Sequence, residues 1–210
     1  PASKKPMTFV DDKAYPVKGE VEETFRTPMQ QPKVSVNFTF TGEMDYSIKN
    51  KVALSFLTQA LNSRYLVSIR EEKGGTYGVQ VYGSTGYIPR ETYSLTMAFD
   101  TNEEMADELC EIILKELRKI AEEGPLTEDT EKTREFLDKN WKNSLEQNGS
   151  WMSYLQAKYG SGLDYLADQE EAVRTTTNAD VQALARKILE DGNMVKVMMR
   201  PEAAEAPAAE

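Results

Sequence analysis

A change of hydrophobic periodicity between residues 34 and 61 constrains the fold more strongly than any other feature of this sequence. From Val34 to Phe40, valine and phenylalanine alternate with polar residues, as they do in a strand with one buried face. After Gly42, apolar residues recur at helical spacing as far as Leu61, and Asp45 is placed to cap this helix. The sequence therefore predicts a half-buried strand followed at once by a long helix.

The remaining patterns predict an α+β domain. The helix is expected to break near residues 62–63 and to resume as far as Glu72, and a capping box of Thr101 and Glu104 is expected to begin the next helix. The other expected elements are strands over 78–84, 91–100 and 194–200, with a further strand allowed over 17–25, a hairpin loop over 86–89, and helices closed by Gly124 and over 127–147, 151–159, 164–174 and 178–189. Strands that pair through a hairpin, with helices packed on one face, predict a mixed, mostly antiparallel sheet.

The two ends of the chain differ in composition from the region between them. Residues 1–16 are polar and without periodicity, which predicts a linker, and the start at Pro1 rather than methionine suggests a fragment of a longer protein. Residues 202–210 are rich in alanine and glutamate, which predicts a disordered tail. We therefore expect a single folded domain over residues 17–201.

The absence of histidine excludes many common catalytic and metal-binding sites. The 210 residues contain no histidine and one cysteine, Cys110. The chain alone can therefore build neither a Ser-His-Asp or Cys-His site nor a zinc site with histidine or several cysteine ligands. Cys110 lies at helical spacing from Ile113 and Leu117, which indicates a buried, inert thiol. Chemistry within this chain would have to come from carboxylates, lysine, tyrosine, serine or threonine.

Charge and hydropathy disfavour two classes of partner. The chain carries 35 acidic and 25 basic residues, a net charge of −10, whereas nucleic-acid binding relies on lysine and arginine to neutralise phosphates. No run of apolar residues approaches the roughly 20 that a membrane span needs. Neither nucleic acid nor a bilayer core is therefore an expected partner.

The segment IREEKGGTYG, residues 69–78, is the most informative part of the sequence. Arg70 ends an amphipathic helix, Gly74 and Gly75 turn the chain, and Tyr77 opens a strand, so a helix end and a strand start can converge on one site. The Arg70 guanidinium could hold a carbonyl or carboxylate, and the Tyr77 phenol could donate a hydrogen bond to a developing oxyanion. The residues alone favour a simpler interpretation, in which Arg70 is a surface charge, Tyr77 is a half-buried strand residue and the two glycines only end the helix.

At this segment the sequence resembles the pitrilysin/insulinase family of zinc peptidases, the inverzincins. The match includes VNFTFTGEMDYSIKNKVALSFLTQALNSRY before it, the EGPLT turn after it, and LEQNGSWMSYLQAKYGSG, which resembles the long bacterial members. The resemblance covers roughly residues 20–201 and implies a mitochondrial-processing-peptidase-like metallohydrolase fold. In this family zinc is held by an HxxEH motif in the N-terminal half, and this chain has no histidine. It therefore resembles the C-terminal, non-metal domain.

The resemblance implies roles for four residues of this chain. Tyr77 would be catalytic, hydrogen-bonding the oxygen of the tetrahedral intermediate, and Arg70 would hold a carbonyl of the peptide beside the scissile bond. Gly74 and Gly75 would let the backbone approach the substrate closely. The implied partners are a peptide substrate and the HxxEH-bearing half, in the same polypeptide or in a partner chain. That half would hold the zinc, with no metal ligand in this chain.

Two alternatives of a different class remain open at the level of sequence. The chain could belong to a non-catalytic scaffold subunit whose arginine and tyrosine only position peptide, or it could be a stand-alone peptide-binding module. An HxxEH motif upstream in the gene would favour the peptidase, and the isolated chain is expected to be inactive in either case. The long bacterial members are often exported, which favours the periplasm over the cytoplasm.

Overall fold

The computed structural model describes residue 13, residues 15–71 and residues 78–202, with the side chains of residues 70 and 71 excluded. Five strands form one sheet in the order β1-β5-β2-β4-β3. The strands are β1 (Glu20–Thr27), β2 (Val34–Glu43), β3 (Gln80–Gly86), β4 (Thr92–Thr101) and β5 (Met194–Pro201). The helices are α1 (Ile48–Tyr65), a π-helix (Leu66–Glu71), α2 (Ala106–Glu123), α3 (Thr127–Ser144), α4 (Asn148–Ser161), α5 (Tyr165–Thr175) and α6 (Asn178–Asp191).

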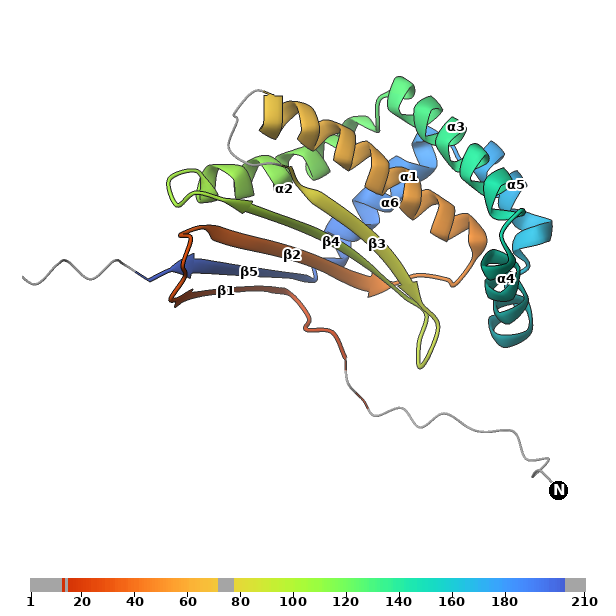
Figure 1. Cartoon of the computed structure of the whole chain (residues 1–210), viewed down its shortest axis with the longest axis horizontal. Coiled ribbons are helices and arrows are strands. Elements are labelled where there is room, and N and C mark those ends of the chain that lie inside the picture. The colour runs from red at the N-terminus through yellow and green to blue at the C-terminus, as the bar shows by residue number, and fades with distance from the viewer. Residues whose placement is uncertain (1–12, 14, 72–77, 203–210) are drawn as a thin grey trace, which may run out of the picture.

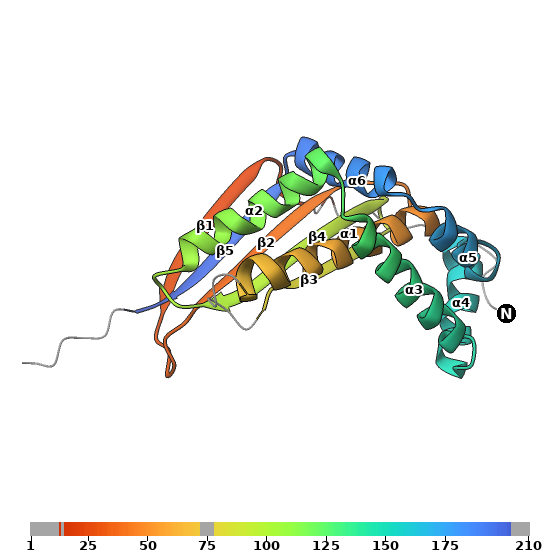
Figure 2. The same cartoon turned by 90° about the horizontal axis from the view of Figure 1, so that it is seen from above.

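The sheet is mixed and mostly antiparallel. β2 pairs antiparallel with β4 and β5, β3 and β4 form an antiparallel hairpin, and β1 adds to β5 in parallel. Helices α1, α2 and α6 cover one face of the sheet, while α3, α4 and α5 extend beyond one end of it (Figures 1 and 2). This arrangement confirms the α+β class predicted from the sequence.

The alternation that predicted β2 separates an apolar face from a polar one. Its four apolar residues are buried, and the apolar residues of β4 lie on the same face beneath the helices. The residues between them are small, polar and only partly buried, and they form the opposite face of the sheet. They include Ser35, Asn37, Thr39, Ser94 and Thr96. The hydrophobic core therefore lies between the sheet and the helices.

The predicted cap and break of the first helix were both wrong. The side chain of Ser47, not Asp45, accepts a hydrogen bond from the Asn50 backbone N–H at 3.2 Å. The helix continues through residues 62–63 and changes to a π-helix at Leu66. Polar residues 62 and 63 are partly exposed, whereas the next two residues are buried, so packing continues the helix where local sequence predicted an end.

The predicted capping box of the second helix was also wrong. Thr101 still belongs to β4, where it pairs with Val34, so it cannot begin a helix. The side-chain Oδ1 of Asn102 instead accepts from the Met105 N–H at 2.9 Å, and the helix begins at Ala106. Sheet pairing therefore outweighs the local capping motif.

Several other elements agree with the sequence. The loop between β3 and β4, the helices after Gly124 and the last strand lie where they were expected, within a few residues. None of the helices in the described part of the chain is long and apolar enough to cross a membrane. The predicted linker over 1–16 and tail over 202–210 fall mostly outside the described residues, so the domain limits at 17 and 201 remain predictions.

We predict that Gly83→Ala destabilises the domain. A Cβ at this position of β3 would lie 2.7 Å from the Leu54 Cγ of α1, and Leu54 is buried. The strand and helix would have to separate, which costs about 1–3 kcal/mol of unfolding free energy in urea titrations. Gly160→Ala in α4 is the control, because its Cβ would meet nothing within 4 Å and alanine favours helix. Equal stability of Gly83→Ala and the wild type would contradict this packing.

Candidate functional site

The four candidate residues follow helix α1 in the sequence; they are Arg70, Gly74, Gly75 and Tyr77. The backbone of Arg70 belongs to the π-helix Leu66–Glu71, and its side chain is not described. Gly74, Gly75 and Tyr77 lie outside the described residues. The structure therefore describes the supports on either side of this segment, and the roles of the four residues remain predictions.

The helix that leads to Arg70 is anchored in the core by Tyr65. The Tyr65 hydroxyl donates to the Ile113 carbonyl oxygen of α2 at 3.0 Å and lies 3.4 Å from the Met97 sulfur of β4. Burial, with a contribution from the charge of Glu116, raises the pKa of Tyr65 well above its ordinary value. Ile69 is also completely buried, one residue before Arg70. The backbone is thus held in place up to Ile69.

A buried ion pair supports the same helix end. The Arg64 guanidinium lies 3.1 Å from the Glu116 carboxylate of α2, and both side chains are more than 85% buried. Arg64 also donates to the Gly124 carbonyl oxygen at 3.4 Å, where α2 ends. Arg64 and Tyr65 were not predicted as supports, although their spacing from Leu57 and Leu61 places them on the buried stripe of the helix.

The π-helix that follows α1 is a rare type of helix. Most π-helical turns in proteins are short insertions, and they occur frequently at functional sites. Here the wider turn follows the two anchors, leaving Leu66 and Val67 about half exposed while Ile69 returns to the core. The backbone therefore departs from α-helical geometry where the segment 69–78 begins.

On the other side of the segment, β3 enters at the edge of the sheet. Gln80 pairs with Ala98 of β4, and Gly78 lines a depression with a volume of about 450 Å³ on the polar face of the sheet.

Asp100 also lines this depression, and it accepts hydrogen bonds from the Lys33 and Ser35 side chains at 2.6 and 2.5 Å. Burial alone would raise the pKa of Asp100, but these hydrogen bonds and the Lys33 charge outweigh it and lower the pKa. Asp100 is therefore an anion near neutral pH.

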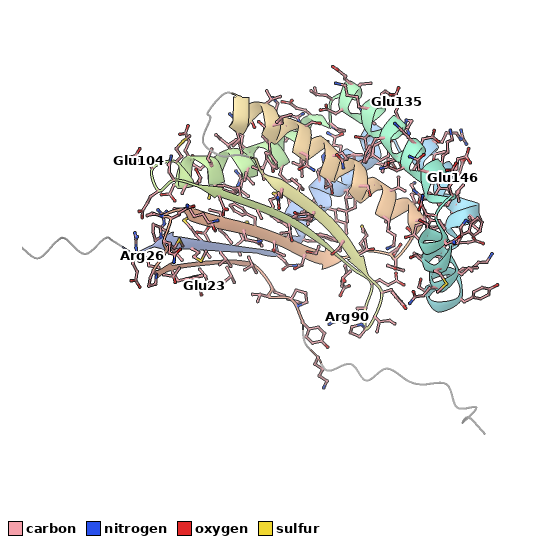
Figure 3. The ribbon with its side chains drawn as sticks, in the orientation of Figure 1. Glu23, Arg26, Arg90, Glu104, Glu135 and Glu146 are labelled. Carbon is pink, nitrogen blue, oxygen red and sulfur yellow. The ribbon has the colours of Figure 1, made fainter. Side chains whose placement is uncertain are left out.

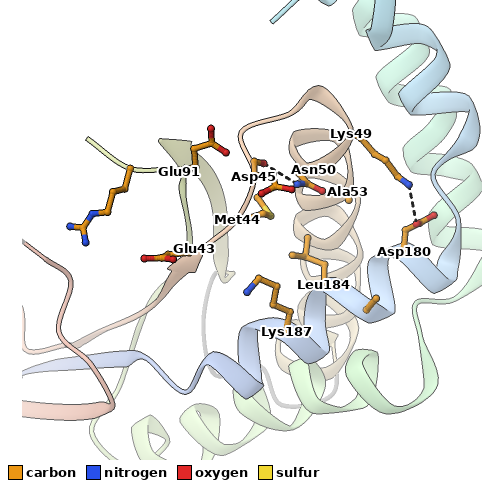
Figure 4. A pocket seen from close by; sticks show the side chains of 12 residues that line it. Glu43, Met44, Asp45, Lys49, Asn50, Ala53, Glu91, Asp180, Leu184 and Lys187 are labelled. Atoms are coloured by element: carbon orange, nitrogen blue, oxygen red, sulfur yellow. Dashed lines mark hydrogen bonds and ion pairs between the residues drawn. The ribbon is translucent and has the colours of Figure 1, made fainter. Parts of the chain in front are cut away.

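A larger depression lies at the other end of α1 (Figure 4). It has a volume of about 720 Å³ and is lined by side chains of both charges, among them Glu43, Lys49, Arg90, Asp180 and Lys187. Lys49 and Asp180, which both line it, form an ion pair at 3.7 Å. Because it borders the start of α1, it is not brought together with Arg70 at the helix end.

The donor atoms of the described residues do not form a zinc site. No group of three or more aspartate, glutamate or cysteine side chains gathers in the described part of the chain, and the sequence has no histidine. The single cysteine, Cys110, is buried, and burial raises its pKa to about 11. The inert thiol that the sequence predicted is consistent with this environment.

Comparison with known proteins identifies the family. Residues 3–137 match the family described as the peptidase M16 inactive domain. The chain belongs to this family. Among curated proteins, it is 24% identical over 193 residues to a zinc protease PQQL-like protein of Arabidopsis thaliana, covering 88% of this chain and 19% of that protein. This M16 domain therefore spans about a fifth of the length of that relative.

Solved structures show the same fold. The periplasmic protease PqqL of Escherichia coli has a TM-score of 0.77 at 16% identity, over 89% of this chain and 21% of that one. A peptidase M16 inactive domain from Pseudomonas fluorescens has a TM-score of 0.73 at 22% identity, over 96% of this chain and 48% of that one. These neighbours confirm the fold that the resemblance to inverzincins implied.

We predict that Arg64→Met loosens the end of α1. The substitution leaves the mostly buried Glu116 without its cation, which costs about 3–5 kcal/mol of unfolding free energy. Urea titration measures this loss, and faster amide hydrogen exchange at residues 66–69 locates it.

The double substitution Arg64→Met and Glu116→Met is the matched control. Removing both charges leaves no unpaired carboxylate, so most of the lost stability should return. If the double variant is as unstable as Arg64→Met, packing of the arginine stem rather than the ion pair supports this helix end.

Proposed function

We propose that this M16 domain supplies substrate-binding and transition-state-stabilising groups to a zinc peptidase site held by another half of the same protein or by a partner chain. The observation that carries the proposal is the M16 inactive-domain match in a chain without histidine. The Arabidopsis relative is named as a zinc protease and PqqL as a protease, which supports peptide hydrolysis as the reaction. Zinc in the HxxEH-bearing half would polarise the scissile carbonyl.

Two side chains of this chain would act on the peptide. The Tyr77 phenol would donate a hydrogen bond to the carbonyl oxygen as it gains negative charge, and it would remain protonated throughout at neutral pH. The Arg70 guanidinium would donate to a neighbouring backbone carbonyl and so hold the peptide in register. Gly74 and Gly75 would leave room for the peptide backbone.

The supports on both sides of residues 70–77 favour this proposal. A donor aimed at a developing charge is effective when it needs no reorganisation during the reaction. Tyr65, Ile69 and the Arg64–Glu116 pair hold the helix end, and the lack of a side chain at Gly83 lets β3 lie close to Leu54 of α1. The polar depression beside Gly78 offers space for a substrate side chain next to this segment.

One structural neighbour bears on the location of the protein, and one alternative function remains. PqqL is described as periplasmic, which supports a periplasmic location for the parent of this chain over a cytoplasmic one. A non-catalytic scaffold subunit with the same fold is the alternative, in which Arg70 and Tyr77 only position peptide. The residues upstream of Pro1 discriminate, because an HxxEH motif there favours the peptidase.

We predict that Tyr77→Phe lowers kcat without weakening peptide binding. In the enzyme assembled with the HxxEH-bearing half, loss of this donor should reduce kcat by about 10²–10³-fold and leave KM nearly unchanged. Steady-state hydrolysis of a fluorogenic peptide measures both. The matched control is Tyr82→Phe, a tyrosine of β3 whose exposed hydroxyl donates to the Gln80 side chain at 2.5 Å. An unchanged kcat for Tyr77→Phe in an active assembly would favour the positioning role instead.

A further inference from the structure

Helix α4 presents an apolar stripe to solvent. Four large side chains lie at positions i, i+1, i+4 and i+8 of the helix, which places them on one side of it. They are Trp151, Met152, Leu155 and Tyr159, and their exposed fractions are 39%, 72%, 45% and 83%. All 14 residues of α4 are described, and none of them is buried. Such a helix gains little stability from its own apolar stripe.

The orientation of α4 is fixed by its inner side. The Tyr154 ring packs between Trp141 of α3 and Tyr165 of α5, with ring centroids 5.1 and 5.3 Å away. The Tyr154 hydroxyl donates to the Ser144 hydroxyl at 2.6 Å, and the Trp151 indole N–H donates to the Leu145 carbonyl oxygen at 2.8 Å. These contacts leave Met152, Leu155 and Tyr159 on the outer side of the helix. Helix α4 itself lies at one end of the molecule (Figure 1).

The composition of α4 differs from that of its exposed neighbour α3. Nine of the 18 residues of α3 are charged, among them Glu135, as expected for a helix in water (Figure 3). In α4, Lys158 is the only charged residue of 14, and it is paired with Asp164 at 2.5 Å. Aromatic residues and methionine with few charges are typical of the centre of a protein interface. Helix α4 has no buried residue whereas α3 has three, so exposure to water does not explain why α4 carries fewer charges.

The area of the stripe identifies the kind of partner. Taking roughly 150–250 Å² for each large side chain, the exposed fractions leave on the order of 500 Å² of accessible surface. A stable complex of separate proteins needs about 800 Å² on each partner. The stripe is too small for a stable dimer of this chain by itself. It suits a partner that is joined covalently or by further contacts, because tethering raises the effective concentration.

We propose that the α4 stripe docks against the HxxEH-bearing half of the parent protein, whose facing surface is apolar and poor in charge. This interaction surface rests on the proposed function, since it assumes that half as the partner. The domain matches only about a fifth of the length of its curated relative, so most of that protein lies outside the match and would be available to cover such a surface. The segment 70–77 would act on the substrate, and α4 would hold the two halves together.

Serine substitutions of the two most exposed residues test the docking surface. The double variant Met152→Ser and Tyr159→Ser removes side chains that are 72% and 83% exposed, so the fold should be retained with an unchanged unfolding midpoint. The control is Leu126→Ser, which removes a leucine that is 58% exposed at the opposite end of α3. Calorimetric titration with the separately produced HxxEH-bearing half measures the dissociation constant, and sedimentation measures the oligomeric state.

We expect Leu126→Ser to bind with wild-type affinity and the double variant to bind with a dissociation constant at least about tenfold higher. We expect the free chain to be monomeric in every case. Wild-type affinity of the double variant, or no binding by the wild type, would overturn the docking surface. A free wild-type dimer that the double variant abolishes would assign the stripe to a second copy and also overturn it.

The same variants distinguish a failure of the docking surface from a failure of the proposed function. If the assembly depends on α4 but shows no hydrolysis that depends on Tyr77, the docking surface stands and the catalytic role fails. If hydrolysis depends on Tyr77 while the double variant assembles and works like the wild type, the catalytic role stands and the docking surface fails.

Discussion

The packing of α1 against the sheet and α2 determines where the two ends of the 70–77 segment lie. At one end, the Tyr65 hydroxyl and the Arg64 guanidinium bind α2 from inside the core. At the other, the absence of a side chain at Gly83 lets β3 approach Leu54 of α1. These contacts are far from any reaction, yet they set the geometry that the proposed donors would need. The placement of the proposed donors would therefore depend on the core of the domain.

Some elements could be predicted from sequence because local and tertiary preferences agree. The alternation in β2 predicts a strand whose apolar face meets the helices, and the structure has it there. The prediction failed where tertiary contacts outweigh a local signal. Thr101 resembles a helix cap, but pairing with Val34 keeps it in β4. Residues 62–63 resemble a break, but the buried Arg64 and Tyr65 continue the helix to a π-helical turn that no local pattern indicates.

The candidate site was predictable only in part, for a similar reason. The family resemblance selected Arg70, Gly74, Gly75 and Tyr77, and the family match confirms the resemblance without testing those roles. The buried supports and the depression beside Asp100 depend on contacts between residues distant in sequence, such as Ser35 with Asp100. Periodicity also placed a helix near Trp151 but could not show that its apolar stripe faces outward, because the period of a helix does not reveal what covers it.

The absence of histidine and the exposed apolar stripe of α4 are both consistent with a domain that binds substrate while another half of the protein holds the metal. A chain that cannot hold zinc through histidine can still contribute hydrogen-bond donors to a zinc site, provided that it is held against the metal-binding half. The proposed role of Tyr77 requires that its side chain lie beside a metal that is bound by the other half. Fluorotyrosine at position 77, observed by ¹⁹F NMR in an assembly whose partner half carries Co²⁺ instead of Zn²⁺, measures this directly. If Tyr77 lies beside the metal, we expect cobalt to broaden the Tyr77 signal strongly, whereas an identical signal with either metal would contradict this placement.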